Sequence, residues 1–253
     1  MKFLRDTWMV FNRSLGQSLR NPIWVIIGLT QPIMYLFLFG PLLKPIAKLP
    51  QFGGTNQYTV FIPGLIVQLG MFGSSFVGFA IIAELRAGVI ERQRVSPLNR
   101  TALLVGRSMR DVVVIIVQAA LLVLASLPLG LKVDAVGGVV AIGLVALMAL
   151  ALSAISYATG LKLKNEDALA PLVNFVVVPL MLLSGLLLPI TLDNGWLRKI
   201  SAVDPLRFTV DAARSLFKGD ILNAVVGKGF AVTAALALVC LYVAVRQFRT
   251  TQA

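Results

Sequence analysis

The residues that could do chemistry are few, and many of them lie in one stretch of the chain. Residues 84–110 read ELRAGVIERQRVSPLNRTALLVGRSMR, with the glutamates Glu84 and Glu91 among six arginines. Charged side chains like these are too costly to place in hydrocarbon. We therefore expect the stretch to lie in water or against another protein. Since apolar runs flank it, we also expect it to carry a force or signal from a soluble partner into a membrane bundle.

Most kinds of catalysis are disfavoured by what the sequence lacks. The chain has no histidine and one cysteine, Cys240, which removes Ser-His and Cys-His pairs, histidine metal sites and any internal disulfide. No GxxxxGK[ST] segment is present, and the nearest stretch, Gly227-Lys228-Gly229, lacks both the spacing and the hydroxyl residue. We expect no catalytic residue, metal or cofactor in this chain. An intramembrane lipid-modifying enzyme with Ser184 as nucleophile is an alternative, although it lacks a nearby base.

The composition indicates a membrane protein. The chain has 253 residues, 58% of them hydrophobic and 13% charged, with a mean hydropathy of +0.87. A soluble domain carries about 25% charged residues, so most of this surface faces something other than water. The formal charge of +12 suits loops that meet anionic lipid headgroups, and we expect no nucleic acid partner. We predict a single all-α membrane domain over residues 1–253.

Six uncharged runs predict six transmembrane helices, because a span needs about 20 apolar residues. The second run is too long for one span, so we expect a loop near residues 53–59. The last run is short, and Lys228 could extend it by snorkelling. The runs are 21–43, 49–83, 112–131, 135–161, 168–192 and 229–245.

The distribution of basic residues predicts the orientation. Six spans place both termini on one side, and more of the 23 lysines and arginines fall on that side than on the other. Positively charged loops favour the cytoplasm. We therefore expect both termini and the loop 84–110 to be cytoplasmic, in a multi-pass protein of a bacterial inner membrane.

Residues 1–20 show the period of an amphipathic helix. Apolar residues recur along one helical stripe, and a membrane must begin immediately beyond Asn21-Pro22. We expect this helix to lie in the headgroup plane, with Trp8 at the interface. The alternative is a surface helix packed on other protein. The stripe consists of Leu4, Trp8, Phe11, Leu15 and Leu19.

Residues 186–225 are too apolar for a free loop and too charged for a span. Pro179, Gly185 and Pro189 predict that the fifth helix ends early. Asp204 followed by Pro205 is typical of a helix start, with the aspartate as cap and the proline at the first position. We expect two short re-entrant or interfacial helices outside the cytoplasm.

Two sets of residues resemble type-2 ABC exporter permeases, in their drug-efflux (daunorubicin-resistance-like) branch. The resemblance covers about residues 20–245, and the first set is the more specific. The chain departs from the family at Phe208, where tyrosine is usual. The first set is Pro63-Gly64-Leu65, Glu84, Arg86, Gly88, Glu91-Arg92 and Ser96-Pro97; the second is Leu183-Ser184-Gly185, Pro189, Asp204-Pro205-Leu206-Arg207-Phe208 and Arg214.

The resemblance implies a permease that exports a hydrophobic or amphipathic compound, drug-like or lipid-like. Export of lipid-linked polysaccharide is the alternative within the same class. It implies a separate ATPase subunit that holds ATP and Mg, and a second permease, identical or a sister chain. A coupling helix between the second and third spans would dock on the ATPase through Glu84, Arg86, Gly88, Glu91, Arg92, Arg94 and Pro97.

The resemblance also implies where a substrate and the outer region lie. The substrate path would run at the interface of two permeases, and polar residues within the spans are candidates to line it. For Gln118, Ser74 and Ser75 an interhelical hydrogen bond is the simpler interpretation. The substrate-path candidates are Gln31, Gln68, Asn174 and Ser184; the residues expected in the re-entrant region are Pro189, Trp196, Pro205 and Arg214.

Overall fold

The computed structural model describes residues 2–21, 23–42, 56–88, 100–186 and 195–251, which form helices joined by short turns and contain no strand. Six segments are long and apolar enough to cross a membrane, as predicted. They are α2 (Ile23–Leu42), α4 (Gln57–Ser75) continued by α5 (Gly78–Arg86), α7 (Arg100–Ser126), α8 (Ala135–Leu163), α9 (Glu166–Leu183) and α12 (Ala224–Thr251).

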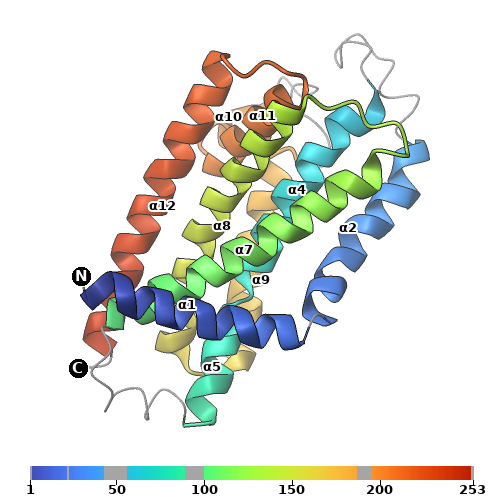
Figure 1. Ribbon diagram of the computed structural model, residues 1–253. Coiled ribbons are helices and arrows are strands. Elements are labelled where there is room, and N and C mark those ends of the chain that lie inside the picture. Colours follow the sequence, from blue (N-terminus) through green and yellow to red (C-terminus); the bar gives the residue numbers. More distant parts are fainter. Residues whose placement is uncertain (1, 22, 43–55, 89–99, 187–194, 252–253) are drawn as a thin grey trace.

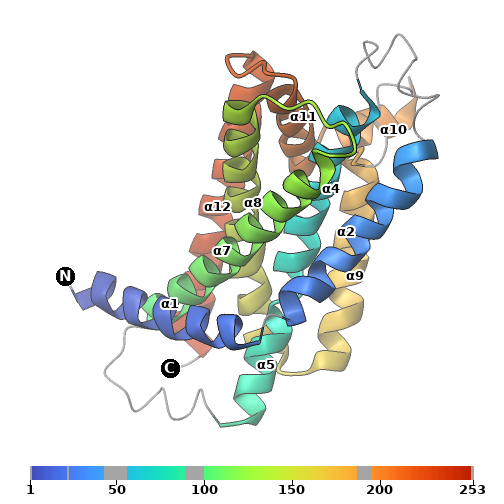
Figure 2. The ribbon, with the colours of Figure 1, turned by 45° about the vertical axis from the view of Figure 1, so that its right-hand side comes forward.

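The spans form one bundle with different structures at its two ends (Figures 1 and 2). Helix α1 (Lys2–Arg20) lies across one end, beside α5 and both termini; we call this the α1 end. Helices α10 (Trp196–Ser201) and α11 (Pro205–Phe217) lie at the opposite end, which we call the α11 end. The two termini therefore share one end, as the count of six spans predicts.

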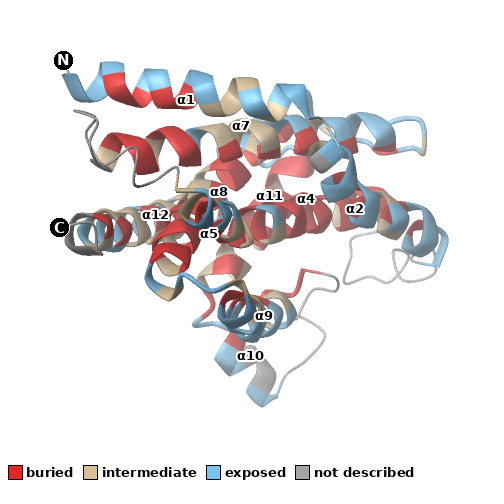
Figure 3. Ribbon diagram, turned by 90° about the horizontal axis from the view of Figure 1, so that it is seen from below, coloured by how far each residue is buried: buried red, intermediate tan, exposed pale blue. Residues whose placement is uncertain are grey.

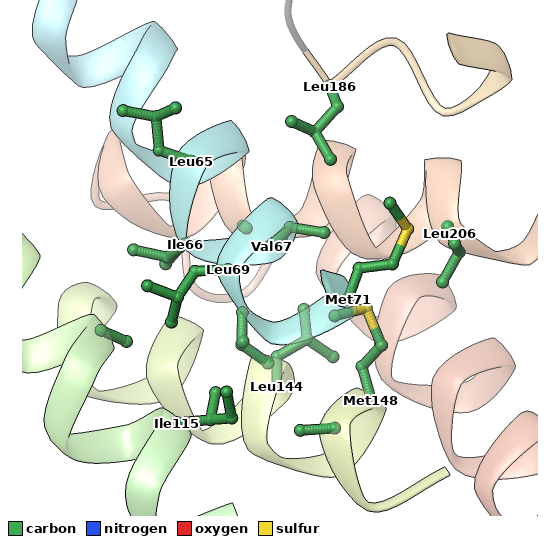
Figure 4. Packing of buried hydrophobic residues seen from close by; sticks show 14 of the residues in the cluster. Leu65, Ile66, Val67, Leu69, Met71, Ile115, Leu144, Met148, Leu186 and Leu206 are labelled. Carbon is green, nitrogen blue, oxygen red and sulfur yellow. The ribbon is translucent and has the colours of Figure 1, made fainter. Parts of the chain in front are cut away.

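Helix α4 lies at the centre of the bundle and is buried along most of its length. Leu65, Ile66 and Met71 face neighbours from α7, α8 and α11 (Figure 4). Gly70 allows the close approach, because a Cβ there would lie 2.7 Å from Val145 Cγ1. Small residues that let two helices approach closely are typical of helix contacts within a membrane.

The second span is broken between α4 and α5, at Phe76 and Val77. Ser156 of α8 satisfies the backbone at this point: its hydroxyl accepts from the Gly78 N–H at 2.9 Å and donates to the Ser75 carbonyl at 2.6 Å. Pro63 lies inside α4 without interrupting the helix. The break thus follows from tertiary contacts with α8, since backbone groups freed within a span need a protein partner.

One predicted span boundary is wrong. The helix of the third span begins at Arg100, not near residue 112, so that Arg107, Arg110 and Asp111 belong to helix α7 and are not part of a loop. The helix of the last span extends beyond the short apolar run, as predicted, since α12 starts at Ala224 and includes Lys228; snorkelling of Lys228 stays a prediction. The error in α7 arose because we expected every charge in residues 84–110 to face water or another protein. Several are instead paired within this chain.

Helix α1 packs on α7 through a narrow face (Figure 3). Thr7 and Val10 are buried where they meet Gly106, at which an added Cβ would lie 2.8 Å from the Thr7 carbonyl oxygen. Phe11 is buried as well, although it belongs to the apolar stripe that we expected to face the headgroups. Leu4, Trp8 and Leu19 are exposed, with Leu4 and Leu19 both at 72%. Helix α1 therefore contacts the bundle with one face and keeps an apolar stripe free.

The region between α9 and α12 contains the two short helices that we predicted. Asp204 Oδ1 accepts from the Leu206 N–H at 2.9 Å and Pro205 occupies the first position of α11, which confirms the predicted cap. Helix α9 ends at Leu183, before Gly185 at φ +67°, so the predicted early end is also confirmed. Pro189 lies outside the described residues.

Candidate functional site

A cavity of about 900 Å³ lies at the α1 half of the bundle. Residues of α1, α2, α4, α5 and α7 form most of its wall, and Tyr157 of α8 and Glu166 of α9 complete it. Figure 2 shows α2 running beside α7 and passing in front of α4, above the level of α1. The volume falls within the range of small-molecule sites, roughly 300–1,000 Å³.

Three glutamines line the part of the cavity farther from α1. Gln118 donates from Nε2 to the Val25 carbonyl at 3.0 Å, so it joins α7 to α2 as predicted. Gln31 is exposed and donates to Tyr35 Oη at 3.2 Å. Gln68 of α4 is only 2% exposed, and its Oε1 has no hydrogen-bond partner within the described part of the chain. This region thus offers polar groups within an otherwise apolar span.

Aromatic rings line another part of the wall. Phe72 and Phe76 stack with ring centroids 6.2 Å apart, and Phe76 and Phe79 stack at 5.9 Å. All three residues line the cavity, together with apolar side chains such as Leu69 and Ile115. The wall therefore suits the apolar body of a ligand, because burial of aromatic and aliphatic surface is favourable.

The floor of the cavity, at the α1 end, consists of paired charges. Arg107 of α7 is 7% exposed and donates from Nη2 to Glu84 Oε2 of α5. Arg86 Nη1 lies 3.2 Å from Glu166 Oε1, which joins α5 to α9. The two pairs hold the end of α5 between its neighbours. Arg107 is the buried member, and a buried charge is stable only when it is paired, whereas the side chains of Arg86 and Glu166 are both exposed.

A second set of polar contacts joins α1, α7 and α8 at the same level. Arg110 Nη2 lies 3.0 Å from Asp111 Oδ1 and donates to Tyr157 Oη at 3.1 Å. Tyr157 donates in turn to Asp111 Oδ2 at 2.6 Å. Arg110 Nη1 donates to Ser18 Oγ of α1 at 3.1 Å. Helix α1 is therefore hydrogen-bonded to the bundle at its C-terminal half as well as packed on α7.

The structure places three of the seven predicted coupling residues. Glu84 and Arg86 lie in the last turn of α5 and pair within this chain, as described above. Gly88 follows at φ +66°, a backbone conformation that suits glycine. The remaining coupling residues, Glu91, Arg92, Arg94 and Pro97, lie outside the described residues.

Two of the four predicted substrate-path residues meet in the cavity and two do not. Gln31 and Gln68 both line it. Asn174 is exposed on α9, where its Nδ2 donates to the Ala170 carbonyl of the same helix at 3.1 Å. Ser184 is buried and donates to the Met181 carbonyl at 2.8 Å. Both side chains therefore form hydrogen bonds with the backbone of the helix that carries them.

The residues predicted for the re-entrant region lie at the α11 end, away from the cavity. Trp196 is 72% exposed at the start of α10. Arg214 is buried, and its Nη2 donates to the carbonyls of Gly185 at 2.9 Å and Leu186 at 3.0 Å, which holds α11 against the end of α9. Burial lowers the pKa of Arg214 to about 10. Burial likewise raises the pKa of Asp204 to about 6, although the Leu206 N–H and Arg207 partly oppose the shift.

The buried polar cluster on α7 was not predicted from the sequence. Arg107, Arg110 and Asp111 lie at helical positions i, i+3 and i+4, so that they share one face of a helix. That spacing could have been found by extending the third span back by three turns. Tyr157 had no signal of its own, because it lies within a long apolar run. Within the described ranges, no group of three or more potential metal ligands is found.

Comparisons with known proteins point in one direction. A family model described as "ABC-2 type transporter" matches residues 5–218. A daunorubicin resistance ABC transporter permease protein of Streptomyces coeruleorubidus is 27% identical over 240 residues, which cover 92% of this chain and 82% of that protein. A putative transport permease of Cyanophora paradoxa is 26% identical over 217 residues, covering 85% and 75%. A probable doxorubicin resistance permease of Mycobacterium tuberculosis (strain H37Rv) is 22% identical over 241 residues, covering 94% and 86%.

Proposed function

The chain belongs to the ABC-2 type transporter family, and on this premise we propose that it is the permease subunit of an ATP-driven exporter. The compound exported would be hydrophobic or amphipathic and would leave from the cytoplasm or the inner leaflet. A separate ATPase subunit would bind ATP and Mg, and a second permease would complete the complex. The relatives named for daunorubicin and doxorubicin resistance support this substrate class.

The observation that carries the proposal is the cavity at the α1 half of the bundle. Its wall combines stacked phenylalanines with glutamines, and its floor is ionic. A compound with an apolar body and a polar end matches such a lining. The volume of about 900 Å³ suits one drug-sized or lipid-sized molecule more readily than a polysaccharide chain. We propose that substrate is taken up here from the inner half of the membrane.

The proposed route for energy runs through the segment that joins α5 to α7. Glu84 and Arg86 connect the last turn of α5 to α7 and α9, so a force applied after Gly88 would reach the cavity floor directly. We propose that the sequence around Glu91, Arg92, Arg94 and Pro97 docks on the ATPase. Helix α1, with its free apolar stripe, would rest in the headgroup plane beside it.

Transport in inverted membrane vesicles tests the proposal. When ATP is added, vesicles that contain the permease and its co-purifying ATPase should accumulate an uncharged fluorescent amphiphile such as Nile red, measured as the fluorescence retained by the vesicles after filtration. Vesicles that contain the permease alone should not. Equal uptake with and without ATP, or no ATPase retained on purification in mild detergent, would argue against an ATP-driven exporter.

Charge reversal tests the docking segment separately. Glu91→Arg should lower the permease-dependent stimulation of ATPase activity about tenfold or more, since like charges facing each other at an interface are strongly unfavourable. Insertion into the membrane should not change. Asp220→Arg, an exposed reversal at the α11 end, is the matched control and should leave stimulation intact. Normal coupling in Glu91→Arg would remove this residue from the docking surface.

A further inference from the structure

The carboxamide of Gln68 is an unsatisfied polar group in the wall of the cavity. Its side chain is buried at 2% exposure, and Oε1 has no hydrogen-bond partner among the described residues. Buried acceptors are nearly always paired, because an unpaired one loses its hydration and gains nothing in return. Since Gln68 lines a cavity large enough for a ligand, a donor on that ligand is a natural partner for Oε1.

The ionised side chains that line the cavity are paired with one another or with a neighbour. Glu84 pairs with Arg107, Asp111 with Arg110, and Glu166 with Arg86. A charged ligand entering this space would find no excess of opposite charge to offset its own desolvation. The lining therefore favours a ligand without net charge.

One donor at the floor is also left without a partner. Arg110 Nε is buried and makes no hydrogen bond within the described part of the chain, although both Nη atoms of Arg110 do. A ligand that accepts a hydrogen bond at this end would satisfy it. The cavity thus presents an unpaired donor near its floor and an unpaired acceptor farther from it.

The distance between these two groups follows from the helices that carry them. Ile115 lies five residues beyond Arg110 on α7, and it contacts the positions of Gly70 and Gly73 on the antiparallel α4. Gln68 lies two to five residues farther along α4 from those glycines. At 1.5 Å per residue, Gln68 and Arg110 are separated by roughly 10–15 Å along the bundle. Between the levels of Gln68 and Arg110, the cavity wall is apolar and includes Phe72 and Ile115.

We propose that the cavity binds an uncharged amphiphile with two hydrogen-bonding groups, of which Gln68 recognises the deeper one. One group, a hydroxyl or carbonyl, accepts from Arg110 at the floor. The apolar body lies along the phenylalanines. The second group is a hydroxyl or amide N–H that donates to Gln68 Oε1. This inference rests on the proposed function in treating the ligand as the exported compound, and it narrows the substrate class to uncharged molecules with a donor in the apolar half.

A pair of simple probes tests the role of the donor. We would measure equilibrium binding of radiolabelled 1,10-decanediol to the full-length permease in lipid nanodiscs, with empty nanodiscs as background. Its two hydroxyls are held apart by an apolar chain of comparable length. The matched probe is 1,10-dimethoxydecane, which keeps both oxygen acceptors and has no donor.

The variant Gln68→Leu removes the acceptor and keeps a side chain of similar size. We expect the affinity for the diol to fall about five- to tenfold, the usual effect of one lost hydrogen bond. Binding of the dimethoxy probe should not change. Asn174→Leu, which alters an amide on the exposed face of α9, should affect neither probe. Gln68→Met is a second variant that lacks the amide, for use if the leucine variant does not purify as a single species.

Two outcomes would overturn the proposal. If the diol binds Gln68→Leu or Gln68→Met as tightly as the unaltered protein, Gln68 does not accept a hydrogen bond from the ligand. If both probes weaken equally, the substitution has only reshaped the cavity. The assay needs no ATPase, so it separates this inference from the proposed function. Binding that depends on Gln68 without ATP-driven uptake would support the amphiphile site and contradict export. ATP-driven uptake without such binding would support export and contradict the role of Gln68.

Discussion

Asp204 is a carboxylate whose charge the fold tolerates poorly. It is 3% exposed, its Oδ1 caps α11 and its Oδ2 has no partner among the described residues. Burial raises its pKa to about 6, above the ordinary value of 3.8. The folded state therefore holds a proton more tightly than the unfolded state. Its contribution to stability is fully present below about pH 4 and is lost as the pH rises through about 6.

Replacement by asparagine should remove this pH dependence. Asp204→Asn keeps an oxygen for the Leu206 N–H but carries no charge. At pH 8 the variant should be more stable than the unaltered protein by at most about 3 kcal/mol, since the shift is about two pKa units. The apparent Tm in detergent, measured at pH 4.5 and pH 8, checks this. The difference in apparent Tm between the variant and the unaltered protein should shrink to about a third at pH 4.5. Asp220→Asn, which alters an exposed carboxylate, should show no such dependence on pH.

At the residue level, local patterns in the sequence predicted caps and packing better than they predicted ionic partners. Asp204 before Pro205 was sufficient to predict the start of α11, because capping depends on adjacent residues. Arg107 and Arg110 were assigned to a loop, because their partners Glu84, Asp111 and Tyr157 come from the chain's own tertiary fold. A charge pattern alone does not distinguish a partner in the same chain from one in another protein.

Ser156 controls the break in the second span. Its hydroxyl accepts from the Gly78 N–H and donates to the Ser75 carbonyl, so it bonds to both sides of the α4–α5 junction. Ser156→Ala should destabilise the protein by about 1–3 kcal/mol, because a buried N–H loses its acceptor. It should also weaken coupling to the ATPase, because α5 would lose its fixed direction.

The control for Ser156 is Ser153, one turn earlier on α8. Ser153 is fully buried and donates only within its own helix, to the Leu150 carbonyl at 3.2 Å. Ser153→Ala should change the apparent Tm and ATPase stimulation little. If both alanine variants behave alike, the hydrogen bonds across the junction do not set the direction of α5.

Hydropathy predicted the number of spans correctly but not all of their limits. Six runs gave six helices because each span must be apolar over about 20 residues. Helix α7 extends twelve residues before the predicted run, because Arg110 near its start bonds to Ser18 of α1 and to Tyr157 of α8. The break at Phe76 and Val77 could not be predicted, because it depends on a serine about 80 residues away.

For the whole molecule, the unequal distribution of basic residues predicts which end faces the cytoplasm. After Cys240→Ala, single cysteines at Asp167 and Asp220 would mark the α1 end and the α11 end. A membrane-impermeant maleimide added to intact bacterial cells should label Asp220→Cys and should label Asp167→Cys only after permeabilisation. The opposite labelling pattern would show that the protein has the inverted orientation, with the segment after Gly88 outside the cell.

The cavity could be predicted only in part from the sequence. Gln31 and Gln68 stood out as amides within apolar runs, and both line it. Asn174 and Ser184 stood out for the same reason and lie elsewhere, because the sequence does not say which face of a helix meets its neighbours. The ionic floor depends on the fold bringing α5 against α7 and α9, and the hydrogen bond from Arg110 to Ser18 depends on α1 lying across that end of the bundle.

If the proposed coupling is right, the break in the second span would make α5 a lever. The nine residues of α5 are about 13 Å long, and Ser156 holds the backbone at their start. A force applied at the far end of α5 would then rotate this helix about the break, and a rotation of ten degrees would move that end by roughly 2 Å. Glu84 and Arg86 lie near that end, so α7 and α9, which are bound to α5 by ion pairs, would move with it.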